Sequence, residues 1–314
     1  MKNVTTLGEV FNTVERMSED YTDRLVNINH ISFEHLGQVR IKGEPHSLKP
    51  IAKRAICNRL RIPYQYLNKC PFDLQSRNLN HWIEREKNSE LFFRFDGDQV
   101  RALFTPKYKP FDNLIILQKL ESLGYGHGTT VQCNLDEKFM LLRILDGHKS
   151  FSVNGDRITP GIAISNSEVG LSSFSIAASF LRLVCTNGLI AKTELSASYR
   201  HVSSKILDEF SGVMEKVSLE FGPQMAQFRL SVESRVDDPE ETINSFNIQF
   251  GLGKMEQEAV EWGWGFEEGD TMFHIINAYT RAAQFQDLPA ASSYALQRAG
   301  GNILGMLKEG GNHV

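Results

Sequence analysis

The feature that most constrains the fold is a hairpin-like stretch in the middle of the chain. Four apolar residues from Phe174 to Phe180 alternate with small or polar residues, and this period of two predicts a β-strand. The pair Asn187-Gly188 tolerates positive φ, so it predicts a tight hairpin turn. A second run, residues 189–199, can pair back onto the first strand. We therefore expect this hairpin to form the spine of a central sheet.

Three basic or titratable side chains accompany the hairpin. Arg182 interrupts the apolar face of the first strand, and Arg200 and His201 follow the second. An arginine is costly to bury unless it is paired. Two interpretations stay open. Arg182 forms an ion pair with Glu168 or Glu194 that fixes the register of the strands, or these side chains bind a phosphate from outside.

The formal net charge of −4 conceals an uneven distribution of charge. Residues 39–110 carry 15 basic and 7 acidic side chains, whereas residues 208–314 carry 7 basic and 17 acidic ones. A basic block inside an acidic protein indicates a localised site for an anion. The alternative is that the basic block packs against the acidic C-terminal part, so that the two neutralise each other.

Several classes of protein are excluded or disfavoured by absent motifs. No window approaches ~18 uninterrupted apolar residues, and the N-terminus lacks the blocks of a signal peptide, so we expect a cytoplasmic protein. The four cysteines are far apart, which disfavours zinc and disulfide frameworks. No Walker, G-x-S-x-G or H-E-x-x-H motif occurs. We assign no catalytic residue, no metal and no cofactor.

The periodicities predict an α+β fold with a central, mostly antiparallel sheet. We expect a helical N-terminal module in residues 1–88, basic from residue 39. A β-rich core in residues 89–205 and an acidic helical part in residues 206–314, packing on that core, are expected to follow. Residues 262–266, which combine aromatic side chains with two glycines, are expected to form a loop.

The basic block also predicts where nucleic acid would bind. Helical spacing places several of its cations on one side of a helix ending near residue 61, and a basic, aromatic loop follows near residue 107. Cations neutralise phosphates and aromatic rings stack on bases, although an ordinary solvated face is the alternative. The predicted nucleic-acid site comprises Lys49, Lys53, Arg54, Arg61, Arg101, Lys107, Tyr108, Lys109, Arg182, Arg200 and His201.

Three stretches together resemble a known family. They are Arg-Ile-Pro-Tyr-Gln-Tyr-Leu at residues 61–67, the region from Asn-Ser-Glu-Val-Gly (166–170) to Arg-Leu-Val-Cys-Thr-Asn-Gly (182–188), and Asn-Ala-Tyr-Thr-Arg with Gln-Arg-Ala-Gly (277–300). This pattern resembles the phage/plasmid-like protein family, a domain of unknown function carried by phages, plasmids and integrative elements. The resemblance implies a role in mobile-element DNA metabolism, and it supplies no catalytic residue.

Our leading hypothesis is a nucleic-acid-binding protein that engages single-stranded DNA in recombination, annealing or replication. The acidic C-terminal part would contact partners, including other copies of the chain in an oligomer. The second hypothesis is a protein-interaction factor in defence or counter-defence. The third is a metal-dependent nucleic-acid-processing enzyme that uses Glu168 and His201.

Overall fold

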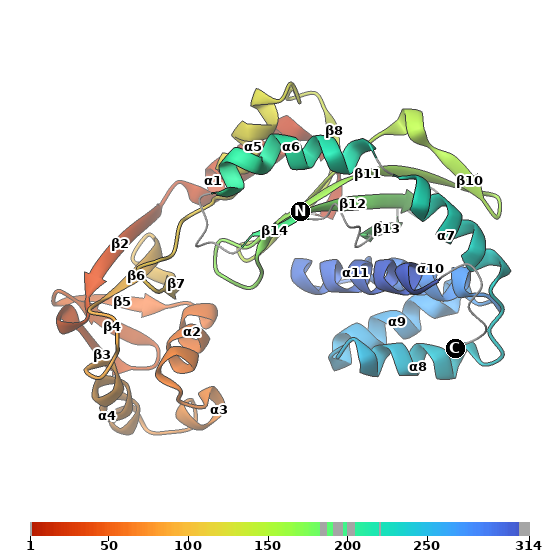
Figure 1. The fold of residues 1–314 in the computed structure, drawn as a ribbon. Helices are drawn as coiled ribbons and strands as arrows, with labels where there is room; N and C mark the ends of the chain where they lie inside the picture. Colours follow the sequence, from red (N-terminus) through yellow and green to blue (C-terminus); the bar gives the residue numbers. More distant parts are fainter. Residues whose placement is uncertain (1, 183–186, 191–196, 200–204, 220, 308–314) are drawn as a thin grey trace.

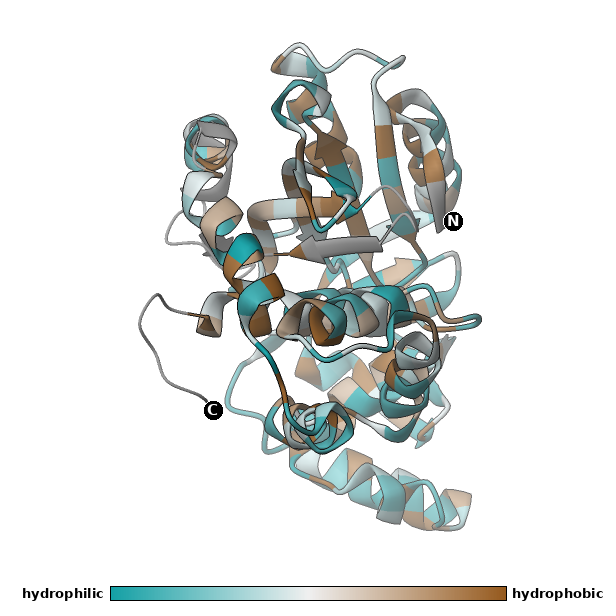
Figure 2. Ribbon diagram, turned by 90° about the vertical axis from the view of Figure 1, so that its right-hand side faces the viewer, coloured by the Kyte–Doolittle hydropathy of each residue, from teal (hydrophilic) through white to brown (hydrophobic). Residues whose placement is uncertain are grey.

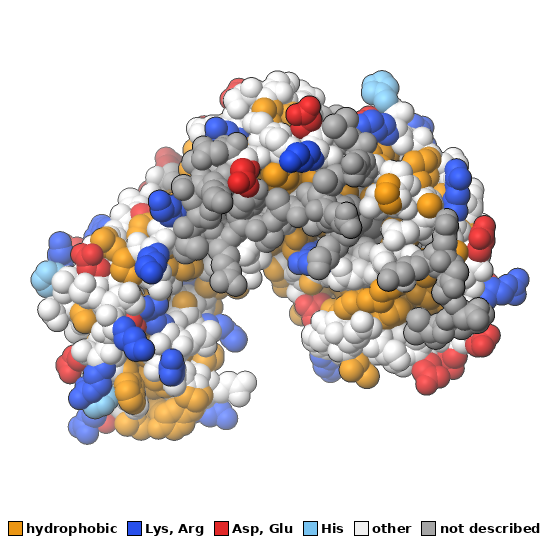
Figure 3. Space-filling view, in the orientation of Figure 1, with side chains coloured by type: hydrophobic (Ala, Val, Ile, Leu, Met, Phe, Trp, Pro, Cys, Tyr) orange, Lys and Arg blue, Asp and Glu red, His pale blue; other side chains and the backbone are white. Residues whose placement is uncertain are grey.

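The computed structural model describes residues 2–182, 187–190, 197–199, 205–219 and 221–307. The chain has an α+β fold with two mostly antiparallel sheets, which confirms the predicted fold class. Each sheet belongs to one of two lobes, and the lobes form the arms of an arch (Figure 1). The space-filling view shows the hollow between the arms (Figure 3). Of the described helices, none is long and apolar enough to cross a membrane.

The N-terminal lobe, residues 21–104, is a six-stranded sheet with three helices. Its strand order is β2-β6-β7-β5-β4-β3, and all neighbours are antiparallel except β5 and β7. Helices α2 and α4 share one apolar core with the sheet through side chains such as Ile56 and Leu79. The elements are β2 (Tyr21–Asn27), β3 (Ile31–His35), β4 (Gln38–Ile41), β5 (Glu44–Leu48), α2 (Pro50–Leu60), α3 (Tyr64–Leu67), α4 (Phe72–Ile83), β6 (Glu90–Asp96) and β7 (Gln99–Phe104).

This lobe differs from the helical module expected in residues 1–88. Four strands precede its helices, and β6 and β7, expected to open the β-rich core, complete its sheet instead. The physical reason for this difference lies in the apolar core of the lobe. Strand β6 supplies Leu91, Phe93 and Phe95, which are fully buried against the helices and the other strands. Part of the apolar face on which the helices pack therefore comes from sequence beyond residue 88.

Among the described residues the central sheet has eight strands, and all of their pairings are antiparallel. Its main strand order is β1-β8-β9-β11-β12-β13, with β10 beside β11 and β14 beside β12. The N-terminal strand β1 therefore forms one edge of a sheet that is otherwise built from residues 130–199. The strands are β1 (Lys2–Thr6), β8 (Thr130–Leu135), β9 (Met140–Leu145), β10 (Phe151–Val153), β11 (Asp156–Asn166), β12 (Phe174–Arg182), β13 (Asn187–Ile190) and β14 (Ala197–Tyr199).

Helices cover both faces of the central sheet. On one face Phe174 of β12 contacts Phe111 and Phe210, at ring-centroid distances of 4.9 and 6.1 Å. On the other, Ser175 lies 3.2 Å from the Tyr294 hydroxyl of α11. The helices combine brown and teal segments, as expected of helices with one buried side (Figure 2). They are α1 (Leu7–Ser18), α5 (Asn113–Ser122), α6 (Lys205–Leu219), α7 (Gly222–Glu233), α8 (Pro239–Gln249), α9 (Lys254–Glu267), α10 (Met272–Ala282) and α11 (Ala290–Met306).

The predicted strand in the middle of the chain is present, but the pair expected to form its turn lies in the next strand. Strand β12 continues to Arg182, which pairs with Asn187, while Leu181 pairs with Gly188. The pair Asn187-Gly188 therefore opens β13 rather than forming the turn. The register requires residues 183–186 to connect the two strands, and these lie outside the described residues.

Residues 262–266 also depart from the expected loop, because they lie inside α9. Glycine at position 263 explains the difference. The backbone of α10 at Ala278 approaches so closely that a Cβ on Gly263 would overlap its carbonyl oxygen. The glycine thus permits close packing of two helices and does not end the first.

The N-terminal lobe is inserted between two helices of the central lobe. The chain leaves the central lobe after α1 and returns to it before α5, and these helices share one apolar core through residues such as Val10, Phe11, Ile116 and Leu117. The connection from β7 to α5, residues 105–112, therefore lies at the junction of the two arms (Figure 1).

Candidate nucleic-acid interface

The basic block keeps a large surplus of unpaired cations after folding. Of its 15 basic residues, six lie within 4.0 Å of a carboxylate. Within the part of the chain that the structure describes, the other nine have no carboxylate at that distance; eight are exposed and one, Lys53, is half-exposed. These nine are Lys42, Lys53, Arg54, Arg61, Lys69, Arg77, Lys87, Lys107 and Lys109.

The acidic C-terminal part does not neutralise this block. Every carboxylate that pairs with residues 39–110 lies between Asp23 and Glu168 in the chain. Among the described residues, no ion pair joins the block to residues 208–314, and helices α8 to α11 lie in the arm opposite the N-terminal lobe (Figure 1). The basic surface therefore faces solvent rather than the acidic helices of its own chain.

Helix α2 positions three of the predicted contact residues. Its buried side packs on the sheet, so Arg54 projects outward, where its guanidinium lies 4.8 Å from the centre of the Tyr64 ring. Lys53 is half-exposed beside it. Arg61 ends the helix in the left-handed region at φ 57°, a conformation usually taken by glycine. The three cations flank the outer side of one short helix.

The loop between β7 and α5 presents two further cations. Tyr108 anchors it, because its ring stacks on Phe104 at a centroid distance of 3.9 Å and its hydroxyl donates to the Glu168 carbonyl at 3.3 Å. Burial raises the pKa of Tyr108 to about 12. Its neighbours Lys107 and Lys109 are exposed. Tyr108 was predicted to stack on bases, and its burial rules out that role in this conformation.

Arg101, another residue of the predicted site, is buried and paired within the protein. Its Nη2 donates to Glu168 Oε2 at 2.5 Å, and its guanidinium lies 3.5 Å from the centre of the Tyr21 ring. The other carboxylate oxygen, Oε1, accepts the backbone N–H of Asn113 at 2.8 Å. Arg101 is 3% exposed. A phosphate would have to displace Glu168 from a closed network to reach it.

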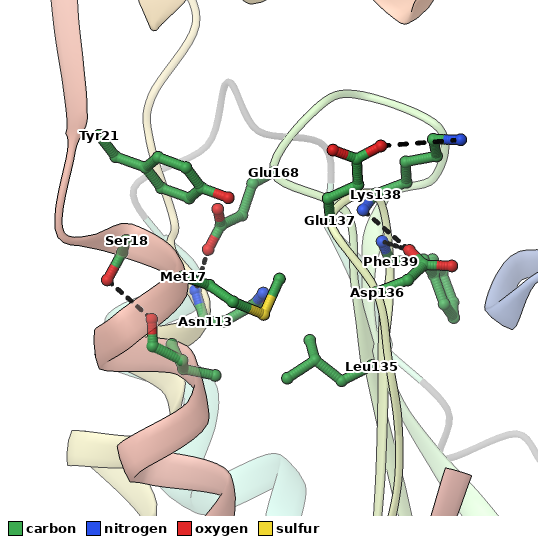
Figure 4. Close-up of a pocket in the computed structure, with 11 residues that line it drawn as sticks. Met17, Ser18, Tyr21, Asn113, Leu135, Asp136, Glu137, Lys138, Phe139 and Glu168 are labelled. Carbon is green, nitrogen blue, oxygen red and sulfur yellow. Dashed lines mark hydrogen bonds and ion pairs between the residues drawn. The ribbon is translucent and has the colours of Figure 1, made fainter. Parts of the chain in front are cut away.

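Figure 4 shows the hollow beside this network, with Glu168, Tyr21 and Asn113 on one side and Lys138 on the other. Its volume is about 10 Å³, room for about one water molecule. The hollow is therefore too small for a nucleotide. Because both carboxylate oxygens of Glu168 already accept hydrogen bonds, this network joins the lobes rather than presenting a free carboxylate.

Lys49 is committed to carboxylates as well. Its ammonium pairs with Asp96 in the N-terminal lobe and lies 3.2 Å from Glu137, at the tip between β8 and β9. Burial alone would lower the pKa of Lys49, but the bonds to both carboxylates raise it. Lys49 thus bridges the lobes and leaves the set of free cations.

Arg182 forms an internal ion pair, which was one of its two interpretations, and its described partners are Asp156 and Glu267. Of the two partners expected, Glu168 pairs with Arg101 instead, and Glu194 lies outside the described residues. The Nε and Nη1 of Arg182 donate to Asp156 and Glu267, both at 2.6 Å, so it ties β12 to α9. Burial favours a lower pKa for Arg182, and the two carboxylates outweigh it and raise the pKa. Arg281 shares Glu267 at 3.0 Å. The strand and two C-terminal helices meet at this network.

The remaining predicted contacts, Arg200 and His201, lie outside the described residues. Because His201 is not described, the hypothesis of a metal site built on Glu168 and His201 stays a prediction. Among the described residues, no group of three or more His, Cys, Asp or Glu side chains could hold a metal ion.

The sequence reasoning missed the aromatic side chains exposed on the same lobe. Tyr66 of α3 and Phe72 and Trp82 of α4 are 53%, 66% and 45% exposed. A signal existed in α4, where Leu79 and Ile83 mark the buried side and Trp82 falls outside that stripe.

A family model described as a domain of unknown function, DUF932, matches residues 102–236, from within β7 to just past α7. The match covers the central sheet apart from β1 and includes Lys107 and Lys109, while the cations of α2 lie outside it. No curated protein matches the chain, and no solved structure does. The match supports a resemblance to a family of unknown function over these residues, and its description assigns no activity.

Proposed function

We propose that this protein binds nucleic acid through the cations of its N-terminal lobe, and that it engages single-stranded DNA in recombination, annealing or replication. The observation that carries the proposal is the surplus of nine cations that pair with no described carboxylate. Such cations bind phosphates by releasing the counterions that surround a polyanion.

Five of these cations belong to the site predicted from the sequence. Lys53, Arg54 and Arg61 flank α2, and Lys107 and Lys109 lie on the loop that returns to the central lobe. The two groups are joined through β7, against which α2 packs. Together they provide a path for a flexible phosphate backbone along the side of the lobe.

The resemblance to phage/plasmid-like proteins supports the proposed setting, which is the DNA metabolism of a phage or plasmid. In that setting single strands arise whenever DNA is recombined, annealed or copied. A protein that binds them without sequence preference would need phosphate and stacking contacts rather than a base-reading helix.

One observation favours a protein-interaction function for the opposite arm. On α8 and α9, Ile248 is 80% exposed, Phe266 59% and Met255 49%. Exposed apolar side chains on acidic helices suit contact with another protein, including a second copy of this chain. This candidate function concerns the acidic C-terminal helices, the acidic arm of the arch, and is compatible with nucleic acid bound to the N-terminal lobe.

The test is the salt dependence of binding to a labelled 30-nucleotide single strand, measured by fluorescence anisotropy. About five phosphate contacts predict a slope near −3.5 for log K against log[salt], so affinity should fall roughly 100-fold between about 50 and 200 mM salt. Absence of binding at about 50 mM salt, where phosphate contacts are strong, would refute the proposal. Binding that ignores salt would refute it equally.

A further inference from the structure

The α3–α4 end of the N-terminal lobe carries an exposed apolar patch bordered by cations. Figure 3 shows this patch at the lower end of the left arm, with Lys and Arg side chains around it. Its most exposed member is Phe72, at 66%, and Tyr66 is 53% exposed. A soluble domain seldom exposes aromatic rings in a group without a binding partner.

The Phe72 ring is held in place from behind. It stacks on the His35 ring at a centroid distance of 4.4 Å and an interplanar angle of 17°. His35 is fixed in turn, because its Nδ1 accepts the backbone N–H of Gly37 at 3.0 Å. A Cβ at position 37 would lie only 2.9 Å from His35 Cε1, so glycine makes room for this arrangement. The outer face of Phe72 is a rigid, solvent-facing platform.

A cation lies close to the residues that support this platform. The Lys53 ammonium would lie 3.6 Å from a Cβ at position 37, which places it next to the residue that fixes His35. Lys53 has no described carboxylate partner, as shown above, and Arg54 follows it on α2 beside Tyr64. The exposed cations Lys69 and Arg77 lie on the same α3–α4 end of the lobe. The cations of α2 and the exposed rings of α3 and α4 therefore belong to helices that pack against one another.

We infer that this surface binds single-stranded nucleic acid by stacking a base on Phe72 while Lys53 contacts an adjacent phosphate. The inference rests on the proposed function and deepens it, because it selects single strands over duplexes. The bases of a duplex stack on one another and offer no free face, whereas an unpaired base offers one to any aromatic ring. Stacking of this kind tolerates every base.

The test compares three probes: a labelled dT20 strand, an abasic deoxyribose-phosphate strand of the same length, and a 20-base-pair duplex. The wild-type protein should bind dT20 at least tenfold more tightly than the abasic strand. Phe72→Ala should weaken dT20 binding by roughly 5- to 100-fold and leave abasic binding unchanged. Phe72→Trp should restore tight dT20 binding, and Leu171→Ala, at an exposed apolar residue of the central lobe, should have no effect.

The outcomes separate this inference from the proposed function. Equal binding of dT20 and the abasic strand would overturn stacking and leave phosphate binding intact. An equal loss on both probes in Phe72→Ala, with circular dichroism unchanged, would also overturn it. Failure to bind any probe would overturn the proposed function itself. If Phe72→Ala instead abolished self-association in sedimentation and spared dT20 binding, the patch would belong to a second copy, and the inference would be wrong.

Discussion

Arg101 Nη2 lies 2.5 Å from Glu168 Oε2, and this buried pair joins the N-terminal lobe to the central sheet. The two residues are 3% and 7% exposed. The carboxylate also accepts the backbone N–H of Asn113 at the start of α5. The Glu168 carboxylate thus contributes, together with the Lys49 bridge, to holding the two arms in place.

Removing that carboxylate should destabilise the fold strongly. Glu168→Ala leaves Arg101 charged and buried without its partner, which should lower the free energy of unfolding by about 3–5 kcal/mol. Urea denaturation followed by circular dichroism measures the change. Glu258→Ala, at an exposed carboxylate of α9, is the control and should change stability by less than about 0.5 kcal/mol. A small loss in Glu168→Ala would show that the pair does not hold the lobes together.

Tyr108 should make stability sensitive to alkaline pH. Its pKa in the folded protein is raised to about 12 from the ordinary value of 10.0, because burial disfavours the phenolate. The unfolded chain thus loses this proton first. The stabilisation is complete below pH 10 and declines between about pH 10 and 12, by about 1.4 kcal/mol per pH unit. Thermal unfolding across this range should show a shallower decline in Tyr108→Phe. Parallel curves for the two proteins would contradict the assignment.

Arg182 and Glu267 should be energetically coupled. Their side chains are 16% and 6% exposed and lie 2.6 Å apart. In a double-mutant cycle of Arg182→Met and Glu267→Gln, the coupling should be about 1–3 kcal/mol, since charged partners in contact are not additive. Chemical denaturation of the four proteins measures it. Additivity within about 0.3 kcal/mol would mean that the strand and α9 are held by other contacts.

Arg143 on β9 leads to the opposite expectation. It is 4% exposed, and its only described side-chain bond is to Gln132 Oε1 at 3.3 Å; its Nε and Nη2 have no partner among the described residues. Burial lowers its pKa to about 10, so it is still charged at neutral pH. Arg143→Met should therefore raise the free energy of unfolding by about 1–3 kcal/mol. Destabilisation in urea would reveal that Arg143 has a compensating partner.

The periodicity of apolar residues predicted the elements that depend mainly on neighbouring residues in the chain. Apolar residues alternate with small or polar ones from Phe174 onward, and this alternation identified β12. The two faces of the strand pack against different helices. The pair Asn187-Gly188 favours a turn by its conformational freedom, but it pairs with Arg182 and Leu181 because the ladder extends that far. The assembly of the N-terminal sheet was not predicted, since β6 joins β2 across more than sixty residues and such a distant pairing leaves no local pattern.

The basic character of the candidate site could be predicted from the sequence, but the set of residues that form it could not. The surplus of cations follows from composition, and it persists in the structure. Which cations remain free depends on tertiary contacts: Arg101 and Lys107 look alike in the sequence, yet one meets Glu168 and the other meets solvent.

The most direct test of the central claim is reversal of charge on α2. Lys53→Glu with Arg54→Glu should weaken single-strand binding by at least about tenfold and reduce the salt slope, because two phosphate contacts become repulsive. The matched control, Arg235→Glu with Lys254→Glu, makes the same change in formal charge on the acidic arm, where both cations are exposed. The account predicts near-wild-type affinity for the control. Equal losses in the two double variants, or none in the first, would contradict a nucleic-acid interface on the N-terminal lobe.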